Sequence, residues 1–362
     1  MVPDIRQEDI DAVISVLRSG MLIQGTKVDE LENNIARYLG VKHAIAVSNG
    51  TASLHMALVA LGIGKGDEVI VPAFSYIATA NVVELVGAKP VFVDIDITTF
   101  NIDINKIEAA ISAKTKAIIP VHEFGLACDI DAVCEIAKKY RLLVIEDAAC
   151  ALGATDHGRF AGTFGLVGSF SFHPRKAITS GEGGMLVTND EAIAKRLRIL
   201  RNHGIEMQNG KMEFVEVGFN YRLTDFQAAL VNSQFKRMEA NLECKDMLAK
   251  IYLENLNNCK YLQLPSNPEN KRHTWQTFHA ILNEDLKQER IIELLKERGI
   301  GTNYGAQCIP FQKYFKNKYK LQADLLFPNS MKAYTKGLAL PLYEKLGIMD
   351  IRRIANEVNK LK

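Results

Sequence analysis

Short apolar runs alternate with amphipathic stretches along the first half of the chain, beginning near residue 40. The apolar runs are rich in β-branched residues and are expected to form strands at 43–47, 68–72, 91–94, 117–121 and 142–146. Between them, apolar side chains recur at helical spacing at 51–61, 77–86, 104–111 and 129–140. Asp103 and Asp129 stand where they can cap two of these helices. The pattern predicts an α/β fold with a mostly parallel sheet, helices on both faces and right-handed crossovers.

A different pattern begins after residue 165, where short β-like runs are separated by glycines. The segments GSFSFHP and GEGGMLVTN predict a β-hairpin that is added to the same sheet. A helix from about Asp190 to Asn202 and an irregular segment at 204–222 are expected next. A further helix, capped by Thr224, is expected to run well past Phe235.

The length of 362 residues exceeds what one ordinary hydrophobic core organises, so two domains are expected. The C-terminal part has a β-like run at 275–282, a charged helix at 286–298 and a final helix after Asp350. This order predicts a large domain at 1–235 and a smaller α+β domain at 236–362.

Composition narrows the function classes. Apolar residues make up 48% of the chain and charged residues 24%, which is typical of a globular protein. The net charge is only +2 and no long Lys/Arg block occurs, so nucleic-acid binding is not expected. An anionic small ligand remains compatible with this charge.

The six cysteines are scattered and form none of the close CxxC pairs that zinc and redox sites use, so we expect reduced thiols and no metal site. The N-terminal segment MVPDIRQEDIDAVISVL is acidic and amphipathic, unlike a signal peptide. Apolar runs such as 142–145 are too short to span a bilayer. We therefore expect a cytoplasmic protein without a membrane partner.

Chemistry is expected at the carboxyl ends of the strands, because ligands of doubly wound sheets bind there. At the first such junction, the segment 48–52 (SNGTA) leads from a strand into a helix. The free N–H groups and the positive end of the helix dipole could hold a phosphate at Gly50-Thr51. Ordinary helix capping is the alternative interpretation.

A second junction ends the apolar run LLVIED with Glu146 and Asp147. A carboxylate at this place can keep the ring nitrogen of pyridoxal 5′-phosphate (PLP) protonated, and the protonated ring is the electron sink of PLP chemistry. A buried structural ion pair is the alternative.

The third junction is the segment 169–184, in which Lys176 follows a strand and precedes a glycine-rich turn. Neighbouring cations and desolvation are expected to lower the pKa of such a lysine enough for Schiff-base formation. A solvated lysine is the alternative. Against it, Gly50-Thr51, Asp147 and Lys176 occur in the order and spacing of a fold type I PLP enzyme.

Several longer segments resemble the DegT/DnrJ/EryC1/StrS family of nucleotide-sugar aminotransferases, and the resemblance covers nearly the whole chain. The segments are SNGTASLHMAL, GDEVIVPAFSYIATAN, KPVFVDID, IEDAACALGA, GSFSFHPRKAITSGEGGMLVTND and VGFNYRLTDFQAAL. The resemblance implies a fold type I PLP-dependent (aspartate aminotransferase-like) fold. It also implies that Lys176 forms the Schiff base with PLP and then moves protons as general acid and base. Asp147 would pair with the pyridinium nitrogen and Tyr76 would stack on the cofactor.

The same resemblance implies how the cofactor phosphate is held. The backbone amides of Gly50, Thr51 and Ala52 and the hydroxyl of Ser171 would bind it. Asn220, in the segment GFNYR, matches a residue that reaches the phosphate of the neighbouring subunit's cofactor. A homodimer with shared active sites is therefore expected.

Two of the departures from the family pattern bear on the site. Cys150 stands where many members carry Gln, Glu or His near the PLP 3′-oxygen, and a thiol forms only weak hydrogen bonds. Near 300–315 many members have a His-containing segment, whereas this chain has Asn303-Tyr304-Gly305-Ala306, so no sugar contacts are carried over. Lys176 itself distinguishes the chain from relatives that carry His there and perform dehydration.

The function expected from the resemblance is transfer of an amino group from L-glutamate to a nucleotide-linked 4-keto-6-deoxy sugar, for amino-sugar and surface polysaccharide biosynthesis. One alternative is a 3-aminotransferase or another PLP reaction on a related nucleotide sugar. Another is a regulatory or binding protein on the same fold that performs no catalysis.

Overall fold

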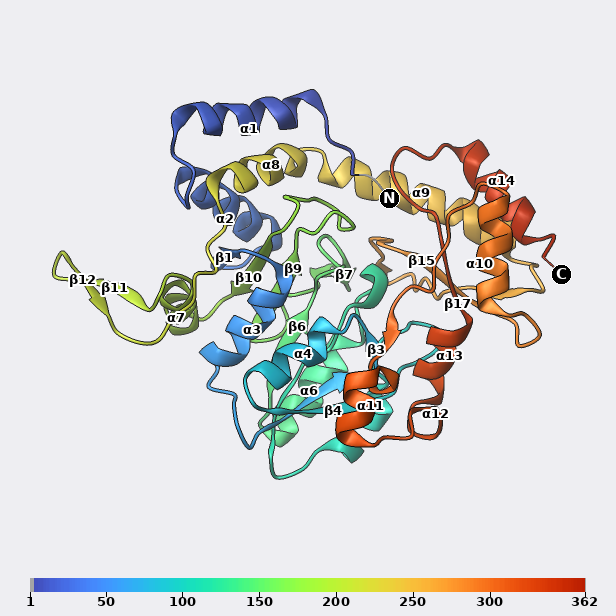
Figure 1. Ribbon diagram of the computed structural model, residues 1–362, viewed down its shortest axis with the longest axis horizontal. Coiled ribbons are helices and arrows are strands. Elements are labelled where there is room, and N and C mark those ends of the chain that lie inside the picture. The colour runs from blue at the N-terminus through green and yellow to red at the C-terminus, as the bar shows by residue number, and fades with distance from the viewer. Residues whose placement is uncertain (1–2, 362) are drawn as a thin grey trace.

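A central β-sheet organises the molecule in the computed structural model, which describes residues 3–361 (Figure 1). Its strand order is β1-β10-β9-β6-β5-β2-β4. Strand β10 runs antiparallel to β1 and β9, and the other neighbouring pairs are parallel. The strands are β1 (His43–Val47), β2 (Glu68–Pro72), β4 (Lys89–Val93), β5 (Thr115–Ile118), β6 (Leu143–Asp147), β9 (Val167–Ser171) and β10 (Gly184–Thr188).

Each apolar run that was predicted to be a strand lies in this sheet, with its ends moved by no more than about three residues. The glycine-rich segments form the antiparallel pair β9–β10, as predicted. The mostly parallel α/β architecture is therefore confirmed.

Helices cover both faces of the sheet, which explains why its strands are almost continuously apolar. Side chains such as Ile45 and Val71 pack on one face, against α3 (Gly50–Ala60), α4 (Ala78–Leu85) and α7 (Glu191–Arg201). On the other face, Ile118 and Val144 pack against α6 (Ile130–Tyr140). Ala44 there packs against α2 (Thr26–Leu39) and α8 (Asp225–Phe235).

Helix caps follow the sequence only in part. Asp103 caps α5 (Ile104–Ile107), where its carboxylate accepts the Asn105 N–H at 3.0 Å. Asp129 occupies the N-cap position of α6, but its side chain accepts no capping hydrogen bond from the described residues. The predicted cap was therefore wrong for Asp129. The residue occupies the N-cap position, but its side chain does not turn toward the helix.

The helix that begins after Thr224 does not run unbroken past Phe235. It ends there, and two residues separate it from α9 (Met238–Leu256). At the break, the Arg237 guanidinium donates to both carboxylate oxygens of the buried Asp9, which lies on α1 (Gln7–Ser19). This tertiary contact lies at the break, and the helical periodicity of the sequence does not reveal it.

The segment 204–222, predicted to be irregular, contains a β-hairpin that projects from the body of the molecule (Figure 1). Its strands are β11 (Ile205–Gln208) and β12 (Lys211–Phe214). Asn209 and Gly210 have φ values of 51° and 76°, as in the type I′ turns that match the twist of two-residue hairpins. The prediction was wrong because it gave no weight to this Asn-Gly pair.

The C-terminal part contains a second, three-stranded sheet with its own hydrophobic core. Trp275, Tyr252 and Ile351 are fully buried in that core. The sheet comprises β13 (Leu262–Gln263), β15 (Phe278–Leu282) and β17 (Gly337–Leu340), with α10 (Gln288–Glu297) and α14 (Ile348–Val358) near it. Smaller elements are β3 (Phe74–Ser75), β7 (Thr155–Asp156), β8 (Arg159–Phe160), β14 (Lys271–Arg272), β16 (Gln307–Cys308), α11 (Lys313–Tyr319), α12 (Ala323–Leu326), α13 (Pro328–Lys336) and the 3-10 turns Glu108–Ala110, Glu123–Gly125 and Ile309–Phe311.

Short strand pairs join this part to the rest, since β14 pairs with β7 and β16 pairs with β3. Within residues 3–361, no helix is both long and apolar enough to cross a membrane.

Candidate active site

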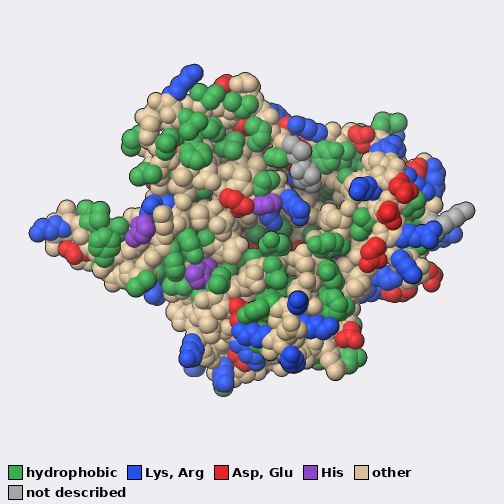
Figure 2. Space-filling view, in the orientation of Figure 1, with side chains coloured by type: hydrophobic (Ala, Val, Ile, Leu, Met, Phe, Trp, Pro, Cys, Tyr) green, Lys and Arg blue, Asp and Glu red, His purple; other side chains and the backbone are tan. Residues whose placement is uncertain are grey.

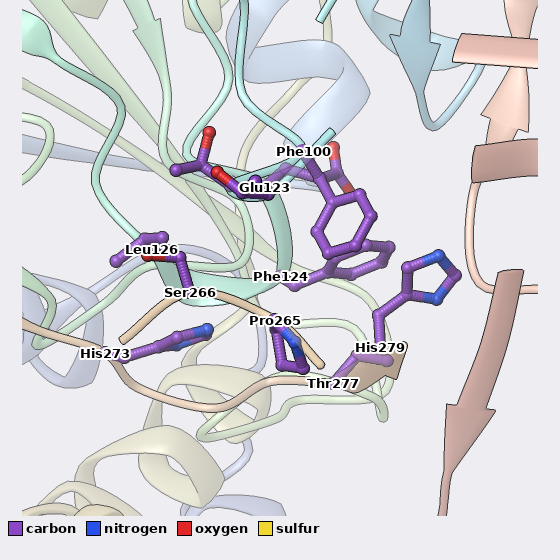
Figure 3. Close-up of a pocket in the computed structure, with 11 residues that line it drawn as sticks. Phe100, Glu123, Phe124, Leu126, Pro265, Ser266, His273, Thr277 and His279 are labelled. Carbon is purple, nitrogen blue, oxygen red and sulfur yellow. The ribbon is translucent and has the colours of Figure 1, made fainter. Parts of the chain in front are cut away.

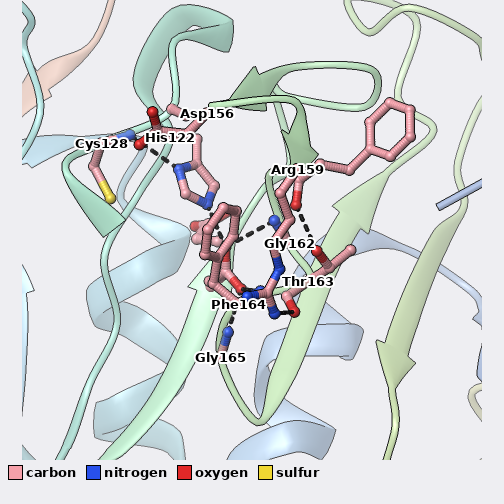
Figure 4. A network of polar contacts seen from close by, with 12 residues as sticks. His122, Cys128, Asp156, Arg159, Gly162, Thr163, Phe164 and Gly165 are labelled. Atoms are coloured by element: carbon pink, nitrogen blue, oxygen red, sulfur yellow. Dashed lines mark hydrogen bonds and ion pairs between the residues drawn. The ribbon is translucent and has the colours of Figure 1, made fainter. Parts of the chain in front are cut away.

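The two acidic residues at the end of β6 have different roles, because successive side chains of a strand point to opposite faces. Glu146 is fully buried and accepts hydrogen bonds from the backbone of Gly162, Phe164 and Gly165 at 2.6–2.7 Å. His122 Nε2 lies 2.8 Å from the same carboxylate (Figure 4). Glu146 therefore fixes the loop 162–165 and the turn at His122 around the strand end.

Asp147 is also buried, at the carboxyl end of β6. Its carboxylate accepts hydrogen bonds from the Thr79 hydroxyl at 2.8 Å and from the Ala149 N–H at 3.2 Å. Burial raises the pKa of Asp147, and the two hydrogen bonds and the nearby Lys176 ammonium offset only part of this rise. These two hydrogen bonds use only part of the acceptor capacity of the carboxylate, so it can also accept a cationic ring N–H.

Lys176 lies in the turn after β9, where its backbone N–H donates to the His173 carbonyl. Its Nζ lies 3.0 Å from Cys150 Sγ. Burial lowers the pKa of Lys176, but the nearby Cys150, Asp147 and Glu123 outweigh this effect, so the pKa lies above its usual value. The expectation of a pKa lowered by neighbouring cations was therefore wrong, because anionic groups face this amine.

The phosphate site predicted at the start of α3 brings Gly50 and Ser171 together. A Cβ atom on Gly50 would lie 2.9 Å from Ser171 Cβ, so only glycine allows this approach. The Ser171 Oγ accepts the His173 N–H at 3.3 Å, which leaves its own O–H free to donate. Asn49 Oδ1 accepts the Ala52 N–H at 2.8 Å, so the Asn49 side chain caps α3 in this structure.

The side chains of Tyr76 and Asn220 are both exposed in this chain. Tyr76 follows β3 and its side chain is 66% exposed. Asn220 is exposed as well, and its backbone bridges to Asn202. Among the described residues, neither side chain forms a hydrogen bond with Lys176, Asp147 or Ser171.

Sequence reasoning missed a third buried acid, Glu123. It lies in the turn directly after His122, and burial raises its pKa to about 7. The signal was present, because Glu123 is a charged residue within the otherwise apolar stretch IIPVHEFGLAC.

The residues present fit PLP. A buried amine is available for the cofactor aldehyde, a buried carboxylate for the ring nitrogen, and a helix start beside a free hydroxyl for the phosphate.

The model of the DegT/DnrJ/EryC1/StrS aminotransferase family matches residues 3–359. The chain belongs to this family. It is therefore a PLP-dependent aminotransferase of fold type I, and its cofactor is PLP.

Individual relatives agree with the family assignment. GDP-perosamine synthase from Caulobacter vibrioides is 45% identical over 279 residues, which are 76% of this chain and 75% of that protein. The solved structure of Helicobacter pylori PseC, an aminotransferase in the biosynthesis of pseudoaminic acid, has a TM-score of 0.94 at 28% identity, covering 99% and 97% of the two chains. A Streptococcus pneumoniae protein described as a sugar aminotransferase, solved in its PLP form, has a TM-score of 0.91 at 28% identity and covers 99% and 98%.

Proposed function

We propose that the enzyme transfers an amino group from L-glutamate to a nucleotide-linked 4-keto-6-deoxy sugar, in amino-sugar and surface polysaccharide biosynthesis. The single observation that carries the chemistry is that the half-buried Lys176 lies at the end of the sheet, close to the buried carboxylate of Asp147. The likeness to GDP-perosamine synthase and to PseC supports a sugar acceptor. We place the reaction in the cytoplasm, where nucleotide-linked sugars are made.

The protein residues have distinct tasks in this reaction. Bound PLP supplies the electron sink and carries the amino group between the two substrates. Lys176 Nζ takes the proton from Cα of the amino donor and returns a proton when the sugar is aminated. Asp147 would stabilise the positive charge on the ring nitrogen of bound PLP. The Thr79 hydroxyl and the Ala149 N–H hold its carboxylate in place. Gly50, Thr51 and Ser171 would bind the phosphate of PLP at the start of α3.

The experiment that tests this proposal is a panel of nucleotide-linked 4-keto sugars incubated with glutamate. We expect one of them to give an amino sugar, identified by mass spectrometry and NMR, and 2-oxoglutarate in equal amount. Lys176→Ala should abolish turnover with the same pair of substrates. Turnover retained by Lys176→Ala would contradict the assignment.

A 3-aminotransferase on a related nucleotide sugar is the alternative within the same chemistry. The segment 303–306 differs from the family pattern, and Tyr304 there is exposed beside Tyr334. Parallel incubations with 3-keto and 4-keto nucleotide sugars distinguish the two reactions by the position of the new nitrogen.

A regulatory or binding protein that holds PLP without turnover is the alternative from a different class. The intact cluster of Lys176 and Asp147 argues against it. Failure to transfer nitrogen from any common amino acid to any sugar of the panel would favour this alternative.

We further propose a homodimer in which each subunit contributes to the other's active site. Exposed apolar side chains on the hairpin and on the loop after α1 support an interface on this side of the molecule (Figure 2). They are Met207, Met212, Phe214, Val217, Met21, Leu22 and Ile23. Asn220 follows the hairpin and is exposed, and within residues 3–361 its side chain forms no hydrogen bond to the cluster, as a residue acting on the partner's site would require.

Mixing two inactive variants tests the shared site. Lys176→Ala and Asn220→Ala proteins should regain part of the activity when mixed, because one site of the heterodimer has both native residues. An active monomer in sedimentation would overturn the proposal.

We also propose that the domains divide near residue 236, into 1–235 and 236–362. The separate core around Trp275 and the break between α8 and α9 support this division.

A further inference from the structure

We propose that Glu123 is a positioning residue of the Lys176 site, where its carboxylate sets the proton affinity of the Lys176 nitrogen in the PLP-bound enzyme. The inference rests on the cofactor site and not on the identity of the sugar. It assigns a second acidic group to the site, in addition to Asp147.

The turn that carries Glu123 is attached directly to the backbone of Asp147, because the His122 N–H donates to the Asp147 carbonyl at 3.0 Å. The Glu123 N–H donates to Asn101 Oδ1 at 2.8 Å, and Asn101 Nδ2 donates to the Leu126 carbonyl at 3.1 Å. Asn101 is itself buried. The position of Glu123 relative to Asp147 is therefore fixed from both sides of the turn.

Backbone strain marks the same turn. Phe124 has a left-handed φ of 54°, which is unfavourable for a bulky side chain. Backbone bonds from the small-domain segment hold it, since Gln276 N–H donates to the Phe124 carbonyl at 2.9 Å and Thr274 N–H to the Gly125 carbonyl at 3.0 Å. Such strain persists where the surroundings fix a functional geometry.

The groups that face Glu123 on the active-site side are Ser75, Asp147, Cys150 and Lys176. Burial raises the pKa of Glu123 to about 7 and the charge of Asp147 adds to this, whereas the Ser75 hydroxyl and the Lys176 ammonium act against it. Glu123 is therefore protonated below about pH 7 and anionic above it.

On its other side, Glu123 lines a small cavity together with His273 and His279 (Figure 3). Burial lowers the pKa of both histidines to about 3, so both are neutral at physiological pH. Lys176 is thus the cation whose charge acts on Glu123.

Cys150 is the other group beside this amine, since its Sγ lies 3.0 Å from Lys176 Nζ. Burial raises the pKa of its thiol, although Lys176 acts against the rise. Glu123 is the acidic group, besides Asp147, whose charge raises the pKa of Lys176.

The test is a pH titration of the visible absorption of the PLP-loaded protein, which reports the protonation of the Lys176 nitrogen without any sugar acceptor. Above pH 7 the Glu123 carboxylate favours the protonated nitrogen. Glu123→Gln removes this charge, so the midpoint should fall by about one pH unit or more. Glu182→Gln, which removes an exposed carboxylate from the glycine-rich segment after Lys176, should leave the midpoint at the wild-type value.

An unchanged midpoint in a folded Glu123→Gln protein, with wild-type circular dichroism and Tm, would overturn the proposal. If Glu123→Gln fails to fold, Glu123→Asp provides the measurement, because it keeps a carboxyl group one methylene farther from the nitrogen. We expect a smaller downward shift in Glu123→Asp, and an unchanged midpoint there would equally contradict the proposal. A failure of the sugar panel would not affect either result.

Discussion

At the scale of single residues, the cluster around Lys176 is governed by the burial of acidic groups beside one amine. Asp147, Glu123 and Cys150 all have pKa values raised by burial, and Lys176 is the cation that stabilises their charged forms. Sequence indicated Lys176 and Asp147, because Asp147 ends one apolar strand and Lys176 lies in the glycine-rich turn after another, in the order and spacing of a fold type I PLP enzyme. It missed Glu123, although this acid interrupts an apolar stretch, because the contacts that hold its turn, with Asn101 and the segment 274–276, are tertiary.

Replacing the Asp147 carboxylate with a neutral amide tests the role of its charge. In Asp147→Asn, the Thr79 hydroxyl keeps an acceptor but the negative charge is lost. We expect the transamination rate with glutamate to fall by about 100-fold, the typical effect of removing one electrostatic contact. Asp131→Asn, on the exposed side of α6, should keep the wild-type rate, and an equal loss in both variants would contradict this role.

The close approach of Gly50 to Ser171 gives a second prediction at this scale. A methyl group at Gly50 would push Ser171 away, so Gly50→Ala should raise the Kd for PLP by at least about tenfold. Gly301→Ala is the matched control, since its Cβ would have no neighbouring atom within 4 Å. Equal PLP affinities of the two variants in fluorescence titrations would refute the predicted phosphate site.

At the scale of elements, the sheet could be predicted from the sequence because its strands are buried on both faces and therefore read as short apolar runs. The hairpin β11–β12 could not be found in this way, since its apolar side chains are exposed and Phe214 is 71% accessible. Helix ends were predictable where a capping side chain is unambiguous, as at Asp190, but not where a distant group such as Asp9 contacts the end.

Two aspartates at N-cap positions allow a direct test of capping. The Asp190 carboxylate accepts the N–H groups of Ala192 and Ile193 at 2.9 and 3.0 Å, whereas Asp129 forms no such bond with any residue that the structure describes. Asp190→Ala should lower the free energy of unfolding by about 1 kcal/mol. Asp129→Ala should have a much smaller effect in the same urea titration, and the opposite order would contradict the assigned caps.

At the scale of the whole molecule, the exposed apolar side chains of the hairpin form the surface on which the proposed homodimer rests. Introducing charges at Met212 and Phe214 should shift the protein toward monomers in sedimentation and reduce turnover. Met349→Glu is the control, because Met349 is 73% exposed at the start of α14, remote from the hairpin in sequence. If the variant with charges at both Met212 and Phe214 stays dimeric, the interface lies elsewhere.

The central claim is that Lys176 holds the cofactor covalently, and peptide mapping tests it most directly. The PLP-loaded protein is reduced with borohydride, digested and examined by mass spectrometry. We predict that the reduced cofactor is found on the peptide containing Lys176 and is lost in Lys176→Ala. A reduced cofactor on another lysine, or retained by Lys176→Ala, would contradict the account.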